Sequence, residues 1–340
     1  MKRAPRIAAI QDLSGFGRCS TTVVLPVLSA MGGQCCPMLT AYLSAHTAFP
    51  PSPHSVFLDL SDQMSETAAH WAELGVTFDA IYSGFLGSAG QIAQIEAFYR
   101  QFRRADTLVL VDPVMGDHGK PYRTYTPELC RRMEELAAQA DVITPNLTEA
   151  SLLLGEDYAS CPGDEAGLRA WLERLSLDGQ RSVVLTGVGL HPGVTGAGCF
   201  DRETGRISFA MARQEPARFS GTGDLFASVL LGSLLRGEGL ADASQRAADF
   251  VQHCVAYTLA VGTPLPEGVQ FEPLLGELMG PAPSRTDVRC QTICNDICRV
   301  KSRSGLGKTP VYKALSTLST GLSTSLFHRV CPQICRFRLT

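Results

Sequence analysis

Short apolar runs alternate with helical patterns through the first 280 residues of this chain. The strand-like runs lie at residues 7–10, 80–82, 107–111 and 142–143, and the helical patterns that follow them lie at about 21–31, 89–103, 127–138 and 147–154. Parallel strands can be joined only by long crossovers, which are usually helices. The alternation therefore predicts an α/β fold with a mainly parallel central sheet and helices on both of its faces.

The later part of this region changes character. A further strand is predicted at 182–185, a polar hairpin at about 195–200 and 206–211, and helical segments at 224–236, 240–261 and 271–278. Open α/β sheets bind their ligands where the carboxyl ends of the strands meet. We therefore expect the chemistry at the ends of the predicted strands.

The composition changes near residue 280. The stretch Gly280-Pro281-Ala282-Pro283-Ser284 is typical of a linker, and residues 281–340 hold ten Lys or Arg, two Asp and five of the twelve cysteines. We expect one domain over residues 1–280 and a basic tail over 281–340 that is disordered or weakly packed, because it buries too little apolar surface to offset chain entropy. Alternatives for the tail are a basic arm that binds nucleic acid or an acidic partner, and a cysteine-based metal site.

The overall composition indicates a water-soluble globular protein. The chain is 45% hydrophobic and 19% charged, with a net charge of −3, which gives no argument for nucleic-acid binding. No apolar run is long enough to cross a membrane, and the apolar stretch after Lys2-Arg3 ends too early, at Gln11-Asp12, for a secretion signal. We expect a cytoplasmic protein with reduced thiols and no membrane partner.

One motif predicts a site for a phosphate group. Gly221-Thr222-Gly223-Asp224 directly precedes an apolar run at helical spacing. Backbone N–H groups at such a helix start, together with the positive end of the helix dipole, hold anions. Asp224 would repel a merely bound anion, but it is useful as a base that takes a proton from an attacking hydroxyl. The alternative is a loop in which Asp224 only stabilises the helix start.

Two acidic loops follow predicted strands. Asp112 and Asp117, in the sequence Asp112-Pro113-Val114-Met115-Gly116-Asp117, suit a hydrated Mg²⁺ beside nucleotide phosphates. In Thr144-Pro145-Asn146-Leu147-Thr148-Glu149, Glu149 stands three residues after Asn146, which predicts a capping box. Glu149 can also orient the water shell of the metal. The alternative for Asp112 is a turn residue bonded to local backbone.

These motifs together resemble the ribokinase superfamily, and within it the pyridoxal/pyridoxamine kinases. The closer signals are Ala9-Ile10-Gln11 with Gly15-Phe16-Gly17, then Ser44-Ala45-His46-Thr47, and Tyr82-Ser83-Gly84-Phe85-Leu86-Gly87-Ser88. The resemblance covers residues 5 to 278 in consistent order and leaves out the tail. It implies a ribokinase-like fold and ATP-dependent phosphorylation of the 5′-hydroxymethyl group of vitamin B6 vitamers, which feeds pyridoxal 5′-phosphate salvage.

The resemblance also implies a role for each motif residue. Asp224 is the expected base, and the amides of Gly221, Thr222 and Gly223 form the anion hole. The expected contacts to Mg-ATP are Asp112, Asp117, Thr144, Asn146, Glu149 and Thr186, with Asp112, Asp117 and Glu149 serving Mg²⁺ partly through water. Asp12, His46, Thr47 and Phe85 are expected around the vitamin ring. A homodimer is implied, and a monovalent cation such as K⁺ is compatible with the resemblance.

Two positions depart from the family pattern, and other functions remain open. Asp12 stands where the best-known members usually have Ser, and Phe85 where they often have Tyr, so the preferred vitamer is left open. Hydroxymethylpyrimidine kinase of thiamine synthesis is a related alternative, although its bacterial members often have Cys at the position of Asp224. A sugar kinase is disfavoured because the chain has no obvious N-terminal lid segment. A non-catalytic B6-binding protein is the alternative from another class.

Overall fold

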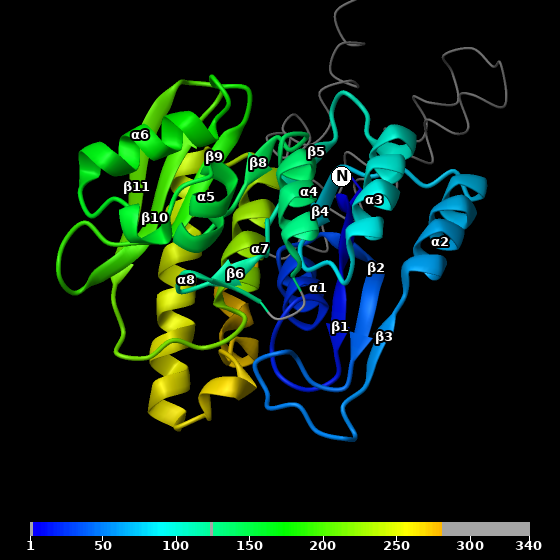
Figure 1. Cartoon of the computed structure of the whole chain (residues 1–340), viewed down its shortest axis with the longest axis horizontal. Coiled ribbons are helices and arrows are strands. Elements are labelled where there is room, and N and C mark those ends of the chain that lie inside the picture. Colours follow the sequence, from blue (N-terminus) through cyan, green and yellow to red (C-terminus); the bar gives the residue numbers. More distant parts are fainter. Residues whose placement is uncertain (1–2, 123–124, 281–340) are drawn as a thin grey trace, which may run out of the picture. The chain divides into compact units, whose positions relative to one another are not determined.

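A nine-stranded sheet organises residues Ala4–Met279, which form one compact unit (Figure 1). The computed structural model describes residues 3–122 and 125–280, so the predicted tail at 281–340 lies outside the described residues. The strand order is β11-β10-β9-β8-β5-β4-β1-β2-β3. The bounds are β1 (Arg6–Ser14), β2 (Gln34–Leu43), β3 (Phe57–Asp59), β4 (Ala80–Ser83), β5 (Leu108–Val111), β8 (Val142–Ile143), β9 (Ser182–Val188), β10 (Val194–Asp201) and β11 (Arg206–Arg213).

The six central strands, from β9 through β8, β5, β4 and β1 to β2, are parallel to one another. The strands outside them are antiparallel to their neighbours: β3 pairs with β2, β10 with β9 and β11 with β10. The prediction of a mainly parallel sheet is confirmed. A separate two-stranded hairpin, β6 (Gly116–Asp117) and β7 (Lys120–Pro121), continues the loop after β5.

Helices cover both faces of the sheet, as predicted (Figure 1). One face carries α1 (Thr21–Ala30), α7 (Thr222–Leu235) and α8 (Leu240–Val261), and the other carries α2 (Ser61–Glu73), α3 (Ala89–Phe102), α4 (Pro127–Ala137), α5 (Leu147–Leu154) and α6 (Glu165–Leu175). Side chains alternate along β1, so that Ile7 and Ala9 join the first core while Ala8 and Ile10 join the second. Short 3₁₀ helices follow at η1 (Tyr158–Ser160), η2 (Leu265–Glu267) and η3 (Glu272–Leu278).

The sequence reasoning missed several elements and misplaced one strand end. It assigned nothing between residues 31 and 80, where β2, β3 and α2 lie, and it missed α6. Met64 is the one buried residue of α2, so that helix has no apolar stripe to detect. The first strand, predicted at residues 7–10, is longer than predicted, because β1 continues to Ser14. The predicted helix at 271–278 is the 3₁₀ helix η3.

Two properties of the described part bear on the environment of the protein. None of its helices combines the length and apolar character needed to cross a membrane. Its seven cysteines are all free thiols.

Candidate active site

The ends of the central strands and the start of α7 surround a cavity of about 600 Å³. Every residue that the sequence predicted for the site lines this cavity: Asp12, His46, Thr47, Phe85, Asp112, Asp117, Thr144, Asn146, Glu149, Thr186, Gly221, Thr222, Gly223 and Asp224. They come from segments more than two hundred residues apart in the sequence, and the parallel sheet brings them together because its strands end at one edge. The structure therefore gathers the predicted residues, while their roles remain predictions.

The start of α7 is open toward the cavity. Gly221 precedes the helix with a φ of 82°, and a Cβ there would lie 2.1 Å from the carbonyl oxygen of Arg18. A Cβ at Gly223 would meet nothing within 4 Å. Gly221, the N-cap residue, has no side chain to cap α7, so the N–H groups of Thr222 and Gly223 are available to an anion. Only glycine fits at position 221, both for its φ and for its close approach to Arg18.

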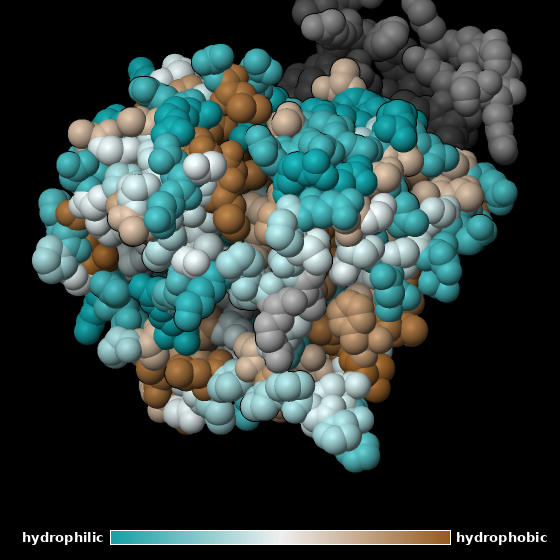
Figure 2. Space-filling model, viewed as in Figure 1, coloured by the Kyte–Doolittle hydropathy of each residue, from teal (hydrophilic) through white to brown (hydrophobic). Residues whose placement is uncertain are grey.

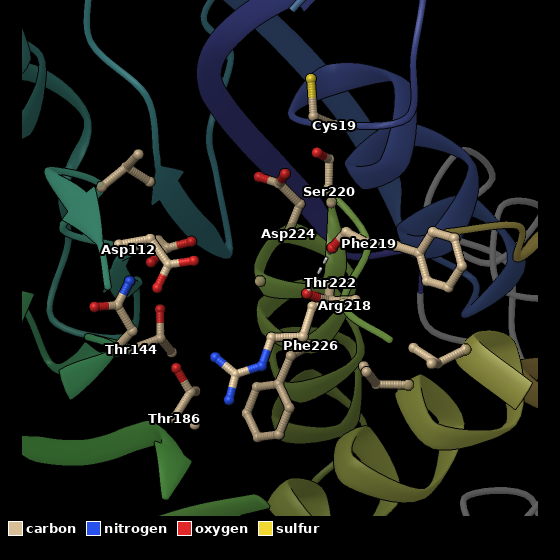
Figure 3. A pocket seen from close by; sticks show the side chains of 18 of the residues that line it. Cys19, Asp112, Thr144, Thr186, Arg218, Phe219, Ser220, Thr222, Asp224 and Phe226 are labelled. Atoms are coloured by element: carbon tan, nitrogen blue, oxygen red, sulfur yellow. Dashed lines mark hydrogen bonds between the residues drawn. The ribbon is translucent and has the colours of Figure 1, made fainter. Parts of the chain in front are cut away.

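Asp224 lies in this first turn and points into the cavity near Ser220 and Cys19 (Figure 3). Burial raises the pKa of its carboxyl group to about 7, and the neighbouring charge of Asp12 acts in the same direction, while a hydrogen bond with the backbone of Ser20 opposes them. A carboxylate with a pKa near neutrality is well suited to accept a proton from a hydroxyl group.

Asp12 reaches the same cavity because β1 is irregular at this point. The pairing of β1 with β2 shifts register between Gln11 and Leu13, and such bulges redirect side chains beside active sites. The Ser14 hydroxyl donates a 2.9 Å hydrogen bond to the Asp12 carboxylate, which is only 3% exposed. Burial raises the pKa of Asp12, whereas the hydroxyls of Ser20 and Ser14 lower it.

His46 is held by the protein through both of its ring nitrogens. Nε2 lies 2.6 Å from the carbonyl oxygen of Pro266, and Nδ1 accepts a 3.3 Å hydrogen bond from the backbone N–H of Ala48. A carbonyl can only accept and an amide N–H can only donate, so Nε2 carries the proton and Nδ1 does not. Burial lowers the pKa of His46, consistent with this neutral form. His46 therefore has only its ring face to offer a ligand, beside Thr47 and Phe85 in the cavity wall.

A capping box fixes the acidic side of the cavity. Asn146 accepts from the backbone N–H groups of Thr148 and Glu149, and Glu149 Oε2 accepts a 2.8 Å hydrogen bond from the N–H of Asn146, which confirms the predicted box. Glu149 Oε1 also accepts from the N–H of Met115, 3.1 Å away, and Asn146 Nδ2 donates to the carbonyl of Gly116. The box thus anchors the loop that carries Asp112 and Asp117.

The three carboxylates predicted to serve a metal differ in their surroundings. Burial and the charge of Asp224 raise the pKa of Asp112 to about 8, and burial with the charge of Asp112 raises that of Glu149 well above its usual value. The Asp117 side chain is 51% exposed. Within residues 3–122 and 125–280, no three acidic, His or Cys side chains are grouped so that they could hold a metal. Asp112 fits a cation best, because a divalent charge would relieve its repulsion.

Sequence reasoning missed Arg218, Ser20 and Cys19, which also line the cavity. Arg218 lies three residues before Gly221, so a search for basic residues beside the anion motif would have found it. Ser20 had no such signal, because its contact with Asp12 depends on the packing of α1 against β1. Figure 3 shows Thr144 and Thr186 on the wall below Asp112, opposite the start of α7.

Comparisons with known proteins match most of this chain. The model of the family called phosphomethylpyrimidine kinase matches residues 25–266. The pyridoxal kinase of Pseudomonas syringae pv. tomato is 30% identical over 272 residues, which cover 77% of this chain and 92% of that protein.

Two solved structures are similar over most of this chain. A Bacteroides thetaiotaomicron protein that carries the name phosphomethylpyrimidine kinase, crystallised with pyridoxal, has a TM-score of 0.77 and 41% identity, and covers 83% of this chain and 98% of its own. Pyridoxal kinase from Lactobacillus plantarum has a TM-score of 0.73 and 33% identity, covering 81% and 96%.

Proposed function

The chain belongs to the phosphomethylpyrimidine kinase family and is a pyridoxal kinase, and from this premise we propose which residues transfer phosphate from ATP to the 5′-hydroxymethyl group of a B6 vitamer. One observation carries the proposal: Asp224, with a pKa near 7, lies at the start of α7 beside the backbone amides of Gly221, Thr222 and Gly223, which we call the anion seat. Asp224 takes the proton of the attacking hydroxyl. The amides of Gly221, Thr222 and Gly223 stabilise the charge on the transferred phosphoryl group.

The vitamin ring occupies the side of the cavity formed by β1 and the loop around His46. Phe85 and the face of His46 offer flat apolar contacts to a pyridine ring. Thr47 lines the same wall, and Asp12 supplies a buried carboxylate on this side. We assign the polar substituents of the ring to Asp12, because its carboxylate can accept hydrogen bonds and attract positive charge.

Replacing Asp12 by Ser should change vitamer preference. Loss of the carboxylate should lower kcat/KM for pyridoxamine relative to pyridoxal by about tenfold, because the protonated amine loses a charge-assisted partner. The measurement is kcat/KM for the two vitamers at saturating ATP, with the KM for ATP as internal control. An unchanged ratio would mean that Asp12 has only a structural role in the bulge.

The nucleotide occupies the opposite side, between α5 and the start of α7. Thr144 and Thr186 offer hydroxyls to its phosphates, and Asn146 and Glu149 hold the loop that carries Asp112. Mg²⁺, if bound with ATP, would be held by Asp112, with Glu149 and Asp117 acting through water, and would neutralise phosphate charge. This use of Asp112 is consistent with the raised pKa of its carboxyl group.

Replacing Asp112 by Ala should therefore raise the KM for ATP and the Mg²⁺ concentration for half-maximal rate by about 10–100-fold. The KM for pyridoxal should stay close to that of the wild type. Asp106→Ala is a matched control, because Asp106 is exposed at the opposite end of β5. A variant that loses affinity for pyridoxal but keeps its Mg²⁺ requirement would place Asp112 on the vitamin side.

We also propose that two copies associate through the β3 edge of the sheet. Val56, Phe57 and Leu58 are 47–53% exposed there, and Figure 2 shows hydrophobic surface over this edge. An exposed apolar edge strand is normally covered by another segment or by another protein chain, because its apolar side chains and backbone groups are otherwise left open to association. Light scattering of the purified protein at micromolar concentration should give the mass of a dimer, and a monomeric mass would contradict this assignment.

The family name makes hydroxymethylpyrimidine kinase the second candidate. The two functions are separated by ADP release from the purified protein with pyridoxal, pyridoxamine, pyridoxine or hydroxymethylpyrimidine as acceptor. B6 vitamers should give turnover with the higher kcat/KM. Turnover confined to hydroxymethylpyrimidine would favour the second candidate, and no turnover with any acceptor would favour a non-catalytic binding protein.

A further inference from the structure

The cavity walls hold more acidic than basic side chains. Its acidic lining residues are Asp12, Asp112, Asp117, Glu149, Glu215 and Asp224, whereas its basic ones, among the described residues, are Arg213 and Arg218. A nucleoside triphosphate would add several negative charges to this cavity. The site therefore needs fixed positive charge near the phosphates in addition to any metal ion.

Of the two arginines, only Arg218 is placed to supply that charge. The Arg213 side chain is 80% exposed, and its Nε points toward Glu215 at 3.8 Å. Arg218 lies just before the anion seat, and Figure 3 shows its guanidinium extending from the start of α7 toward Thr186 and Thr144. Arg218 thus extends into the part of the cavity that Thr144 and Thr186 line.

The contacts of Arg218 leave its N–H groups available. Its Nη1 lies 3.4 Å from Nδ1 and 3.3 Å from Nε2 of His118. Both ring nitrogens of His118 lie within hydrogen-bond distance of Nη1, so His118 holds one end of the guanidinium. Nε and Nη2 of Arg218 form no hydrogen bond with the described residues, so these donors stay free for an anion.

We propose that Arg218 binds the phosphate groups of the nucleotide, bridging the anion seat at Gly221–Gly223 and the wall formed by Thr144 and Thr186. The inference rests on the proposed kinase function and adds a residue to its nucleotide side. A planar guanidinium binds two phosphate oxygens at once, which a threonine hydroxyl or a backbone amide cannot do. His118, on the hairpin formed by β6 and β7, holds it at the edge of the site.

The test is nucleotide binding in the absence of any vitamer. Arg218→Met should weaken ADP binding by about ten- to hundredfold, the usual effect of losing hydrogen bonds to a charged group. Adenosine, which has no phosphate, should bind as it does to the wild type. Isothermal titration calorimetry of both ligands gives the comparison directly. Because Arg218 is exposed, the variant should fold normally, which its melting temperature checks.

Arg213→Met is the matched control, since Arg213 lies at the same cavity but faces Glu215. It should bind ADP like the wild type. Two results would overturn the proposal: unchanged ADP affinity in Arg218→Met, or an equal loss of affinity for ADP and adenosine. A chain that binds ADP but phosphorylates no B6 vitamer would contradict the proposed function and leave the role of Arg218 supported.

Discussion

Asp224→Asn should lower kcat for pyridoxal by about 10²–10⁴-fold, the usual contribution of a general base. Asparagine keeps the size of the side chain but cannot accept the proton of the 5′-hydroxyl. ATP binding should survive, because the amides of Gly221 and Gly223 are unchanged. Asp242→Asn, at an exposed position of α8, is the control and should behave like the wild type. Turnover near the wild-type rate in Asp224→Asn would remove the base from the mechanism.

The raised pKa of Asp224 adds a pH dependence to this result. The base must be ionised, so kcat/KM of the wild type should fall as the pH drops below about 7. Burial disfavours the ionised form of Asp224 in the folded protein, and ionisation therefore lowers the folding stability. This loss of stability is absent below the unfolded pKa of 3.8, grows as the pH rises and is complete above about 7. Asp224→Asn should therefore melt at a higher temperature than the wild type at pH 8, which separates lost catalysis from unfolding.

Gly221→Ala should have the second-largest effect. The new Cβ would lie 2.1 Å from the Arg18 carbonyl oxygen, and the φ of 82° is unfavourable for alanine. The helix start must shift, which misaligns the anion seat and should lower kcat by about 10²–10³-fold. Strain of this kind costs about 1–3 kcal/mol of folding stability.

Gly237→Ala is a matched control for backbone strain alone. Its φ is 88°, but a Cβ there meets nothing within 4 Å, and it lies at the far end of α7. It should lose some stability and keep its kcat. Wild-type kcat in Gly221→Ala would show that the amides at the start of α7 do not act on the phosphoryl group.

Helices and turns whose ends are set by neighbouring residues were predicted correctly from the sequence. The bounds of α5 and α8 match the prediction because their ends are set nearby: Asn146 and Glu149 form a capping box, and Gly262 ends α8 in the left-handed conformation. The hairpin around Asp201-Arg202-Glu203-Thr204-Gly205 was likewise predicted correctly from its turn residues. Motifs at strand ends were enough to collect the residues of the cavity.

Features that depend on distant packing could not be read in the same way. The bulge that turns Asp12 into the cavity is a property of the β1–β2 register, which no local pattern encodes. Asp117 is exposed because it lies on the β6–β7 hairpin, whereas Asp112 is buried. The five-residue spacing of the two residues in the sequence did not indicate this difference in burial. The surface helix α2 buries only Met64 and left no periodic signal.

The most direct test of the account is product analysis with pyridoxal and with 5-deoxypyridoxal, which lacks the attacking hydroxyl. Purified protein with Mg²⁺ and ATP should convert pyridoxal to pyridoxal 5′-phosphate and release ADP in equal amounts, as measured by liquid chromatography and mass spectrometry. With 5-deoxypyridoxal, ADP release should stay at the level seen without acceptor. Equal ADP release with both compounds, or ADP release from pyridoxal without pyridoxal 5′-phosphate, would contradict transfer to the 5′-hydroxymethyl group.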